Sequence, residues 1–132
     1  MIDDTATANP TPKRVLCIED EHFIGELYAR ALTKAGYKVT VELDGQKGLQ
    51  AAQTNQFDII LLDIMVPTMT GIEVLRHLRD PSETPELAAK VIITTNLDED
   101  KETRASIEAQ ADGYIIKAEI TPKELVSILQ KL

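Results

Sequence analysis

The sequence predicts a doubly wound α/β fold, in which helices cover both faces of one parallel sheet. Short apolar runs of strand length alternate along the chain with longer amphipathic segments of helical period. Several runs are apolar throughout, which is typical of parallel strands that are buried on both faces. Right-handed crossovers limit the possible topologies of five strands and five helices, and one order that they allow for the sheet is 2-1-3-4-5, which we adopt as the expected fold.

The first strand is expected at Arg14–Ile18, whose last four residues are apolar. A helix follows over about residues 21–35. Gly36 ends this helix in the manner of a C′ glycine. The second strand is expected at Lys38–Glu42, which contains two valines at alternate positions. The apolar stripe of the first helix, at three- and four-residue spacing, consists of Phe23, Ile24, Leu27, Ala31 and Leu32.

The middle of the chain repeats this alternation. Asp44 can cap a second helix that runs to about residue 54, with apolar residues facing the core. The third strand, Asp58–Asp63, is apolar at every interior position, as a central strand would be. A loop over 64–71 leads into a short helix that ends near Arg79. The next segment, 80–86, contains two prolines and is expected to be a loop.

Two strands and two helices complete the fold. The fourth strand is expected at Lys90–Thr95, followed by a helix over about 99–109. The fifth strand is Gly113–Ile116. The last helix is expected over 122–131, because a threonine followed by a proline is typical of a helix N-cap and its first residue.

Composition limits the classes of function. A chain of 132 residues suits one domain, which we place at 14–132, after a disordered tail at 1–13 rich in Thr, Pro, Asp and Ala. The net charge of −8, without a basic cluster, argues against direct nucleic-acid binding and favours protein partners. The single cysteine excludes an internal disulfide. No membrane span or signal peptide is apparent, so we expect a soluble cytoplasmic protein.

Polar residues follow the strands at the edge where their carboxyl ends meet. They are the pair Glu19-Asp20, then Asp63, Thr95 and Lys117. In open α/β sheets, ligands bind in the crevice beyond these strand ends. Three carboxylates, a hydroxyl and an ammonium group collected there would bind Mg²⁺ and a phosphoryl group.

At these residues the chain resembles the receiver domains of response regulators in two-component signalling. The matching segments are VLCIEDE (15–21), DIILLDIMVPTMTGIEVL (58–75), VIITTN (91–96) and GYIIK (113–117). The similarity covers about residues 14–132. It implies a flavodoxin-like fold and, in particular, a single-domain receiver of the kind found among chemotaxis regulators.

The resemblance implies a role for each residue at the strand ends. Asp63 would be the phosphoacceptor, whose carboxylate attacks phosphorus to form an acyl phosphate. Glu19, Asp20, Asp63 and the main-chain carbonyl of Met65 would hold Mg²⁺, for which Mn²⁺ can substitute. The alternative role for the acidic residues is helix capping or a place in a loop.

The remaining roles concern the phosphoryl oxygens and the response to them. Lys117 would contact one oxygen and Thr95 another, with Thr94 as the competing hydroxyl. Tyr114 matches the switch aromatic of the family, although it could also be a half-exposed sheet tyrosine. Phosphorylation by a sensor histidine kinase or a phosphotransfer protein would change the face formed by the fourth helix, fifth strand and fifth helix. A downstream protein, or a second copy of the chain, would bind that face.

Three departures from the family pattern are apparent. Ala118 replaces the usual proline after the lysine, so we expect either a trans bond there or a costly cis bond, because a cis bond before a non-proline residue costs roughly 3 kcal/mol. Either one should alter the backbone geometry before Glu119. Met65 and Leu97 are apolar at the positions that tune phosphoryl lifetime, which predicts slow autodephosphorylation. Asn96 replaces a small residue and would narrow access to the site.

Four functional hypotheses follow. The first is a stand-alone receiver, which is not an enzyme acting on a separate substrate but assists its own phosphoryl transfer and autodephosphorylation. The second is the receiver portion of a larger regulator or hybrid kinase. The third is a binding module that works without phosphorylation. A flavodoxin-like cofactor carrier or small hydrolase is disfavoured, because no Gly-rich phosphate loop is present.

Overall fold

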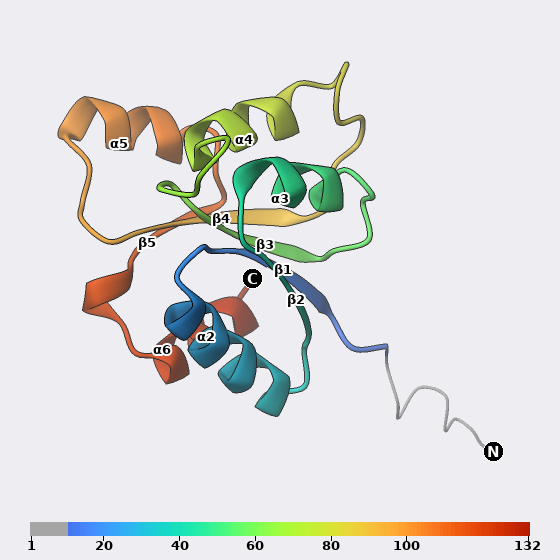
Figure 1. The fold of residues 1–132 in the computed structure, drawn as a ribbon, viewed down its shortest axis with the longest axis vertical. Helices are drawn as coiled ribbons and strands as arrows, with labels where there is room; N and C mark the ends of the chain where they lie inside the picture. The colour runs from blue at the N-terminus through green and yellow to red at the C-terminus, as the bar shows by residue number, and fades with distance from the viewer. Residues whose placement is uncertain (1–10) are drawn as a thin grey trace.

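A computed structural model describes residues 11–132 and has the predicted architecture (Figure 1). The five parallel strands lie in the order β2-β1-β3-β4-β5. The strands are β1 (Arg14–Ile18), β2 (Lys38–Glu42), β3 (Ile59–Asp63), β4 (Lys90–Thr95) and β5 (Gly113–Ile116). The helices are α2 (His22–Lys34), α3 (Gly45–Ala52), α4 (Gly71–Arg79), α5 (Lys101–Glu108) and α6 (Pro122–Gln130), with a 3₁₀ turn η1 (Lys117–Glu119).

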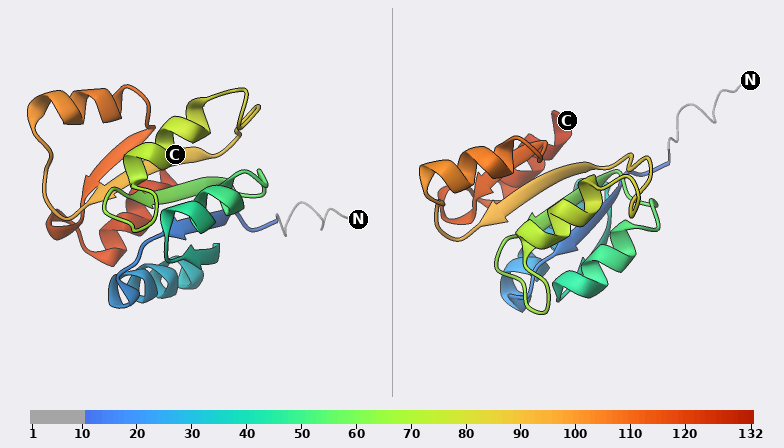
Figure 2. Two further views of the ribbon diagram at one scale, coloured as in Figure 1. Left: turned by 45° about the horizontal axis from the view of Figure 1, so that its top comes forward. Right: turned by 90° about the horizontal axis from the view of Figure 1, so that it is seen from above.

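The sheet separates two layers of helices. Helices α3, α4 and α5 cover one face, and α2 and α6 cover the other (Figures 1 and 2). Alternate strand residues supply the two hydrophobic cores, since successive side chains of a strand point to opposite faces. Leu16 and Leu62 belong to the core under α3–α5, whereas Cys17 and Leu61 belong to the core under α2 and α6. The central strand β3 is buried along its whole length, as its apolar run predicted.

Local signals set the helix boundaries. Asp44 caps α3 by accepting a hydrogen bond from the Lys47 N–H, as predicted. Helix α6 begins at Pro122 and has a capping box, in which Thr121 and Glu124 each accept a bond from the other's backbone N–H. Helix α5 starts two residues later than expected, because the Asp100 side chain caps it.

The structure differs from the expected buried stripe of the first helix, and it describes little of the expected N-terminal tail. Phe23 is 71% exposed, so its assignment to the buried stripe of the first helix was wrong. The buried residues of α2 are instead Gly25, Tyr28 and Leu32. The predicted tail, 1–13, falls mostly outside the described residues, and residues 11–13 have no regular secondary structure. Within the described part of the chain, no helix has the length and apolar character that crossing a membrane requires.

Candidate functional site

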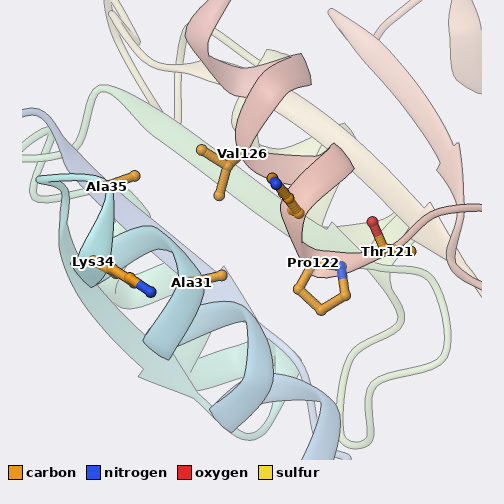
Figure 3. A pocket seen from close by; sticks show the side chains of 7 residues that line it. Ala31, Lys34, Ala35, Thr121, Pro122 and Val126 are labelled. Atoms are coloured by element: carbon orange, nitrogen blue, oxygen red, sulfur yellow. The ribbon is translucent and has the colours of Figure 1, made fainter.

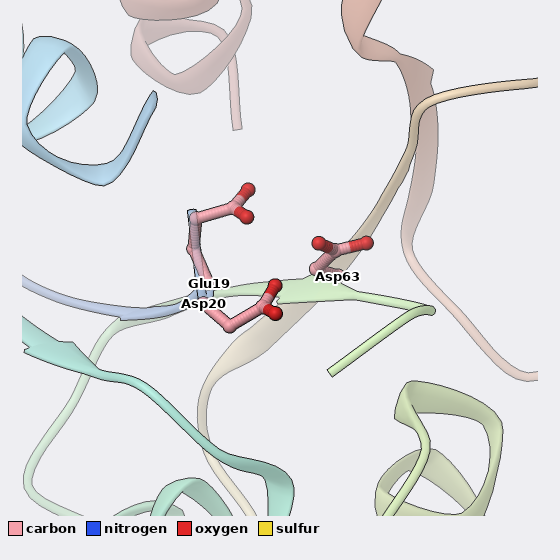
Figure 4. A group of neighbouring side chains, drawn as sticks. All are labelled: Glu19, Asp20 and Asp63. Carbon is pink, nitrogen blue, oxygen red and sulfur yellow. The ribbon is translucent and has the colours of Figure 1, made fainter. Parts of the chain in front are cut away.

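The strand order brings three acidic side chains together at one end of the sheet. Chain connections leave β1 and β3 in opposite directions, so a crevice opens beyond their carboxyl ends. Glu19 and Asp20 follow β1, and Asp63 is the last residue of β3. Carboxylate oxygens from all three lie within 4.8 Å of one another (Figure 4). Glu19 and Asp63 are buried, whereas Asp20 is exposed to solvent.

Lys117 from the end of β5 neutralises the two buried carboxylates. Its Nζ lies 2.6 Å from Glu19 Oε1 and 2.9 Å from Asp63 Oδ2. A third carboxylate, that of Glu21, lies 3.6 Å away and is half exposed. The ammonium group is therefore enclosed by acidic groups from two separate strand ends.

Burial and hydrogen bonding act in opposite directions on the pKa of Glu19 and on that of Lys117. Desolvation raises the pKa of Glu19 to about 7, although the hydrogen bond from Lys117 opposes the shift. Burial also disfavours the charged form of Lys117, but hydrogen bonds to Glu19 and Asp63 outweigh it and raise the pKa of the amine. The amine of Lys117 is thus held as a cation, whereas burial disfavours the charged form of Glu19.

The acidic group fits a hard divalent cation. Mg²⁺ prefers oxygen ligands from one or two carboxylates and keeps several waters. Glu19, Asp20 and Asp63 offer such oxygens, and exposed Asp20 leaves one side of the group open to water. A bound cation would also favour the charged carboxylate of Glu19 and so oppose the effect of burial on its pKa.

The loop after β3 fixes the Asp63 side chain. The Met65 N–H donates to Asp63 Oδ1 at 3.1 Å, while Oδ2 is held by Lys117. The loop closes where the Gly71 N–H donates to the Ile64 carbonyl at 2.9 Å. A Cβ atom on Gly71 would lie only 2.2 Å from the Asp63 carbonyl oxygen, so this close approach requires glycine.

The predicted hydroxyl, Thr95, lies at the end of β4 and is buried. Its Oγ1 donates to the Leu97 carbonyl at 2.7 Å. Thr94 is also buried and is level with Asp63 in the β3–β4 register. The choice of Thr95 over Thr94 therefore stays a prediction.

Tyr114 is held at its hydroxyl by the segment that precedes α5. This hydroxyl donates to Asp98 Oδ1 at 3.1 Å and accepts from the Glu99 N–H at 3.1 Å. Arg104 lies over the ring, 4.5 Å from its centroid, and forms an ion pair of 2.9 Å with Asp98. We call Asp98, Glu99 and Arg104 the tyrosine clamp.

Three apolar side chains on the segments that follow β1, β3 and β4 are exposed. Phe23, Met65 and Leu97 are 71%, 68% and 78% exposed. Asn96 is also exposed, and its Nδ2 lies 3.5 Å from Glu21 Oε2. The Lys117–Ala118 bond is trans, one of the two forms expected for the missing proline, and the chain turns there through η1.

Sequence reasoning missed two residues near the site. Glu21 was not given a role, although three consecutive acids after β1 were a signal for it. Tyr28 was left out of the helical stripe, yet it is buried beside Lys117 in a pocket. Its spacing of four from Ile24 could have indicated this position.

A groove of about 540 Å³ lies between α2 and α6, away from the acidic group (Figure 3). Ala31, Pro122 and Val126 give it apolar walls, and Lys34 and Lys123 flank it. It contains no carboxylate, so its chemistry does not match that of a metal and phosphoryl site.

Comparison with known proteins identifies the family. Residues 15–130 match the model of the response regulator receiver domain, and the chain belongs to this family. It is 35% identical over 104 residues to the response regulator ArlR of Staphylococcus aureus, a match that covers 79% of this chain. The match covers 45% of ArlR, so the chain spans about half the length of this curated relative.

Solved structures agree with this assignment. The chemotaxis response regulator CheY4 of Vibrio cholerae is 28% identical, with a TM-score of 0.78 over 92% of this chain and 98% of that one. The BeF₃-activated N-terminal receiver domain of Klebsiella pneumoniae RstA is 29% identical, with a TM-score of 0.77 over 90% and 97% of the two chains. Receiver domains of this family accept phosphoryl groups from histidine kinases or phosphotransfer proteins, and they bind Mg²⁺ at an acidic pocket.

Proposed function

We propose that this chain accepts a phosphoryl group from a phosphohistidine onto Asp63. The observation that carries the proposal is the position of Asp63, buried in an acidic group and bonded to Lys117 at 2.9 Å. The carboxylate would be the nucleophile, and the cation beside it would offset the negative charge of the incoming phosphoryl group.

The transfer needs little chemistry from the protein beyond positioning. Asp63 Oδ attacks phosphorus, the P–N bond to the donor imidazole breaks, and the electron pair of that bond leaves with the imidazole nitrogen. The Met65 N–H orients the carboxylate, and Lys117 can move from Asp63 to a phosphoryl oxygen. Thr95 would donate its hydroxyl to another oxygen after releasing the Leu97 carbonyl.

Glu19, Asp20 and Asp63, with the Met65 carbonyl, would hold Mg²⁺, or Mn²⁺ in its place. When bound, the cation supplies positive charge that offsets the charge of the phosphoryl oxygens. The described residues fit this use because they leave room for water ligands on the side of Asp20.

The phosphoryl group would act on the face built by α5, β5 and α6. It brings about −1.5 to −2 charges to one end of the sheet. If Thr95 turns toward it, space opens for Tyr114 to leave the tyrosine clamp and turn inward. A downstream protein or a second copy would recognise the changed face. The chain is then a phosphoacceptor that assists its own transfer and autodephosphorylation rather than an enzyme, and a cytoplasmic location stays a prediction.

Intact mass spectrometry after incubation with acetyl phosphate tests the proposal. We expect gain of one phosphoryl group with Mg²⁺ and none with a chelator. Asp63→Asn should abolish the gain, whereas Asp80→Asn, at the C-cap of α4 and outside the acidic group, should not change it. Phosphorylation of the Asp63→Asn variant, or equal gain without a divalent cation, would contradict the assignment.

A second candidate is a receiver that forms part of a larger regulator. The 45% coverage of ArlR favours it. Reading the gene beyond the codon for Leu132 decides between the two, because a further coding segment would support the larger protein. The binding module that works without phosphorylation is supported if the Asp63→Asn variant retains full partner binding.

A further inference from the structure

A second pocket adjoins the phosphorylation site and shares one wall with it. Its volume is about 330 Å³. It lies between α2 and the segment that follows β5, and Lys117 is the residue common to the pocket and the acidic group. The residues that line it include Ile24, Leu27, Tyr28, Asn96, Lys117 and Ile120.

The pocket has the composition of a small-molecule site. Ile24, Leu27 and Ile120 give it aliphatic walls, and Tyr28 and Asn96 supply a few polar groups. Ligand pockets are usually mostly apolar with a small number of placed polar groups, and their volumes are roughly 300–1,000 Å³. This pocket lies at the lower end of that range, so it suits a ligand of one ring or one branched chain.

The hydroxyl of Tyr28 is the independent sign of a ligand. The hydroxyl of Tyr114 has two partners, but that of Tyr28 has no hydrogen-bond partner among residues 11–132. Tyr28 is nevertheless only 5% exposed and lines the pocket. Buried polar groups in native proteins are nearly always paired, and one that is not needs an explanation.

The charges around the pocket select a neutral ligand. The ammonium group of Lys117 is already bonded to Glu19 and Asp63, so it is not free to pair with an anion. The carboxylate of Glu21 lies beside Asn96 and would repel an anion further. A cationic ligand would be repelled by the ammonium group of Lys117, which lines the pocket.

We propose that this pocket binds a small neutral molecule with an apolar body and one hydroxyl or carbonyl group, which pairs with the Tyr28 hydroxyl. This goes beyond phosphoryl transfer, and it does not require Asp63 to be phosphorylated.

Benzyl alcohol and toluene form a matched pair of probes, since they share a ring and differ in the hydroxyl. Backbone amide NMR shifts of the metal-free, unphosphorylated protein report binding. We expect saturable shifts around Ile120 with benzyl alcohol, with a Kd on the order of 1 mM, as is reasonable for so small a ligand. Benzoate, which carries a charge, should not bind.

Two variants test the geometry. Tyr28→Phe should weaken benzyl alcohol roughly fivefold, the effect of one neutral hydrogen bond, and should leave toluene unchanged. Ile24→Trp should fill the pocket and remove binding of both probes. Equal weakening of the two probes by Tyr28→Phe, or shifts that do not saturate, would overturn the proposal. Because no phosphorylation is involved, its failure is separate from failure of the function proposed for Asp63.

Discussion

Gly71→Ala tests how the loop after β3 fixes Asp63, the proposed phosphoacceptor. The added Cβ would lie 2.2 Å from the Asp63 carbonyl oxygen and 2.7 Å from Ile64 Cα. Cβ atoms do not normally approach other atoms within 3.0 Å, so the backbone must move by 0.8 Å, the difference between 3.0 and 2.2 Å. Both neighbours are main-chain atoms, at the end of β3 and the start of the loop, and they cannot turn away as a flexible side chain can.

We expect this substitution to lower the free energy of unfolding by about 2–3 kcal/mol, the upper part of the range for overpacking. For a domain of this size that corresponds to a fall of roughly 10 °C in Tm. Urea denaturation followed by circular dichroism gives the first quantity. The rate of phosphorylation by acetyl phosphate should fall as well, because the displaced backbone carries Asp63.

Gly25→Ala is the matched control. Its Cβ would meet Val41 Cγ1 at 3.6 Å and Glu19 Cγ at 3.7 Å, which are ordinary van der Waals distances. Since Gly25 lies inside α2, alanine should leave stability unchanged or raise it by up to about 1 kcal/mol. If the free energy of unfolding of Gly71→Ala were within about 0.5 kcal/mol of that of the parent protein, the close approach would not constrain the loop and the reasoning would be refuted.

Three further predictions concern the site. Because burial raises the pKa of Glu19 to about 7 from the unfolded value of 4.5, metal-free protein should lose stability as pH rises from about 4.5 to about 7. Added Mg²⁺ should restore that stability, and a denaturation midpoint that does not change over this range would contradict the prediction. Met65→Asn or Leu97→Glu should shorten the phosphoryl lifetime, measured by mass spectrometry, since polar groups there can orient water; slower loss in both would count against it. Asp98→Ala should release Tyr114 from the tyrosine clamp, giving altered ring NMR signals before phosphorylation, and unchanged signals would show that Asp98 does not hold the ring.

The strands were predictable because each is a compact apolar run. The bounds of β1, β2, β4 and β5 match the expected ones, and β3 differs by one residue. The acidic group was predictable for the same reason, since strand ends of a parallel sheet meet at one edge.

Other features depend on tertiary contacts that periodicity does not encode. Phe23 fits a helical stripe by spacing, but it lies at the start of α2, beyond the part that packs on the sheet. The turn η1 has no glycine or proline to indicate it. The hydroxyl of Tyr114 bonds to the tyrosine clamp through Glu99 and Asp98, 15 and 16 positions away, and nothing in the local sequence signals that pairing.

The ion pair between Lys117 and Glu19 joins residues 98 positions apart, and Lys117 is 54 positions from Asp63. A ribosome therefore makes both buried carboxylates long before it makes the cation that neutralises them. Until β5 has been synthesised and has docked beside β4, the growing chain has no arrangement that can shelter Glu19 and Asp63 together. The paired arrangement of these buried groups therefore forms only after the last strand of the sheet has been made, and a nascent chain that still lacks Lys117 exposes both carboxylates to water.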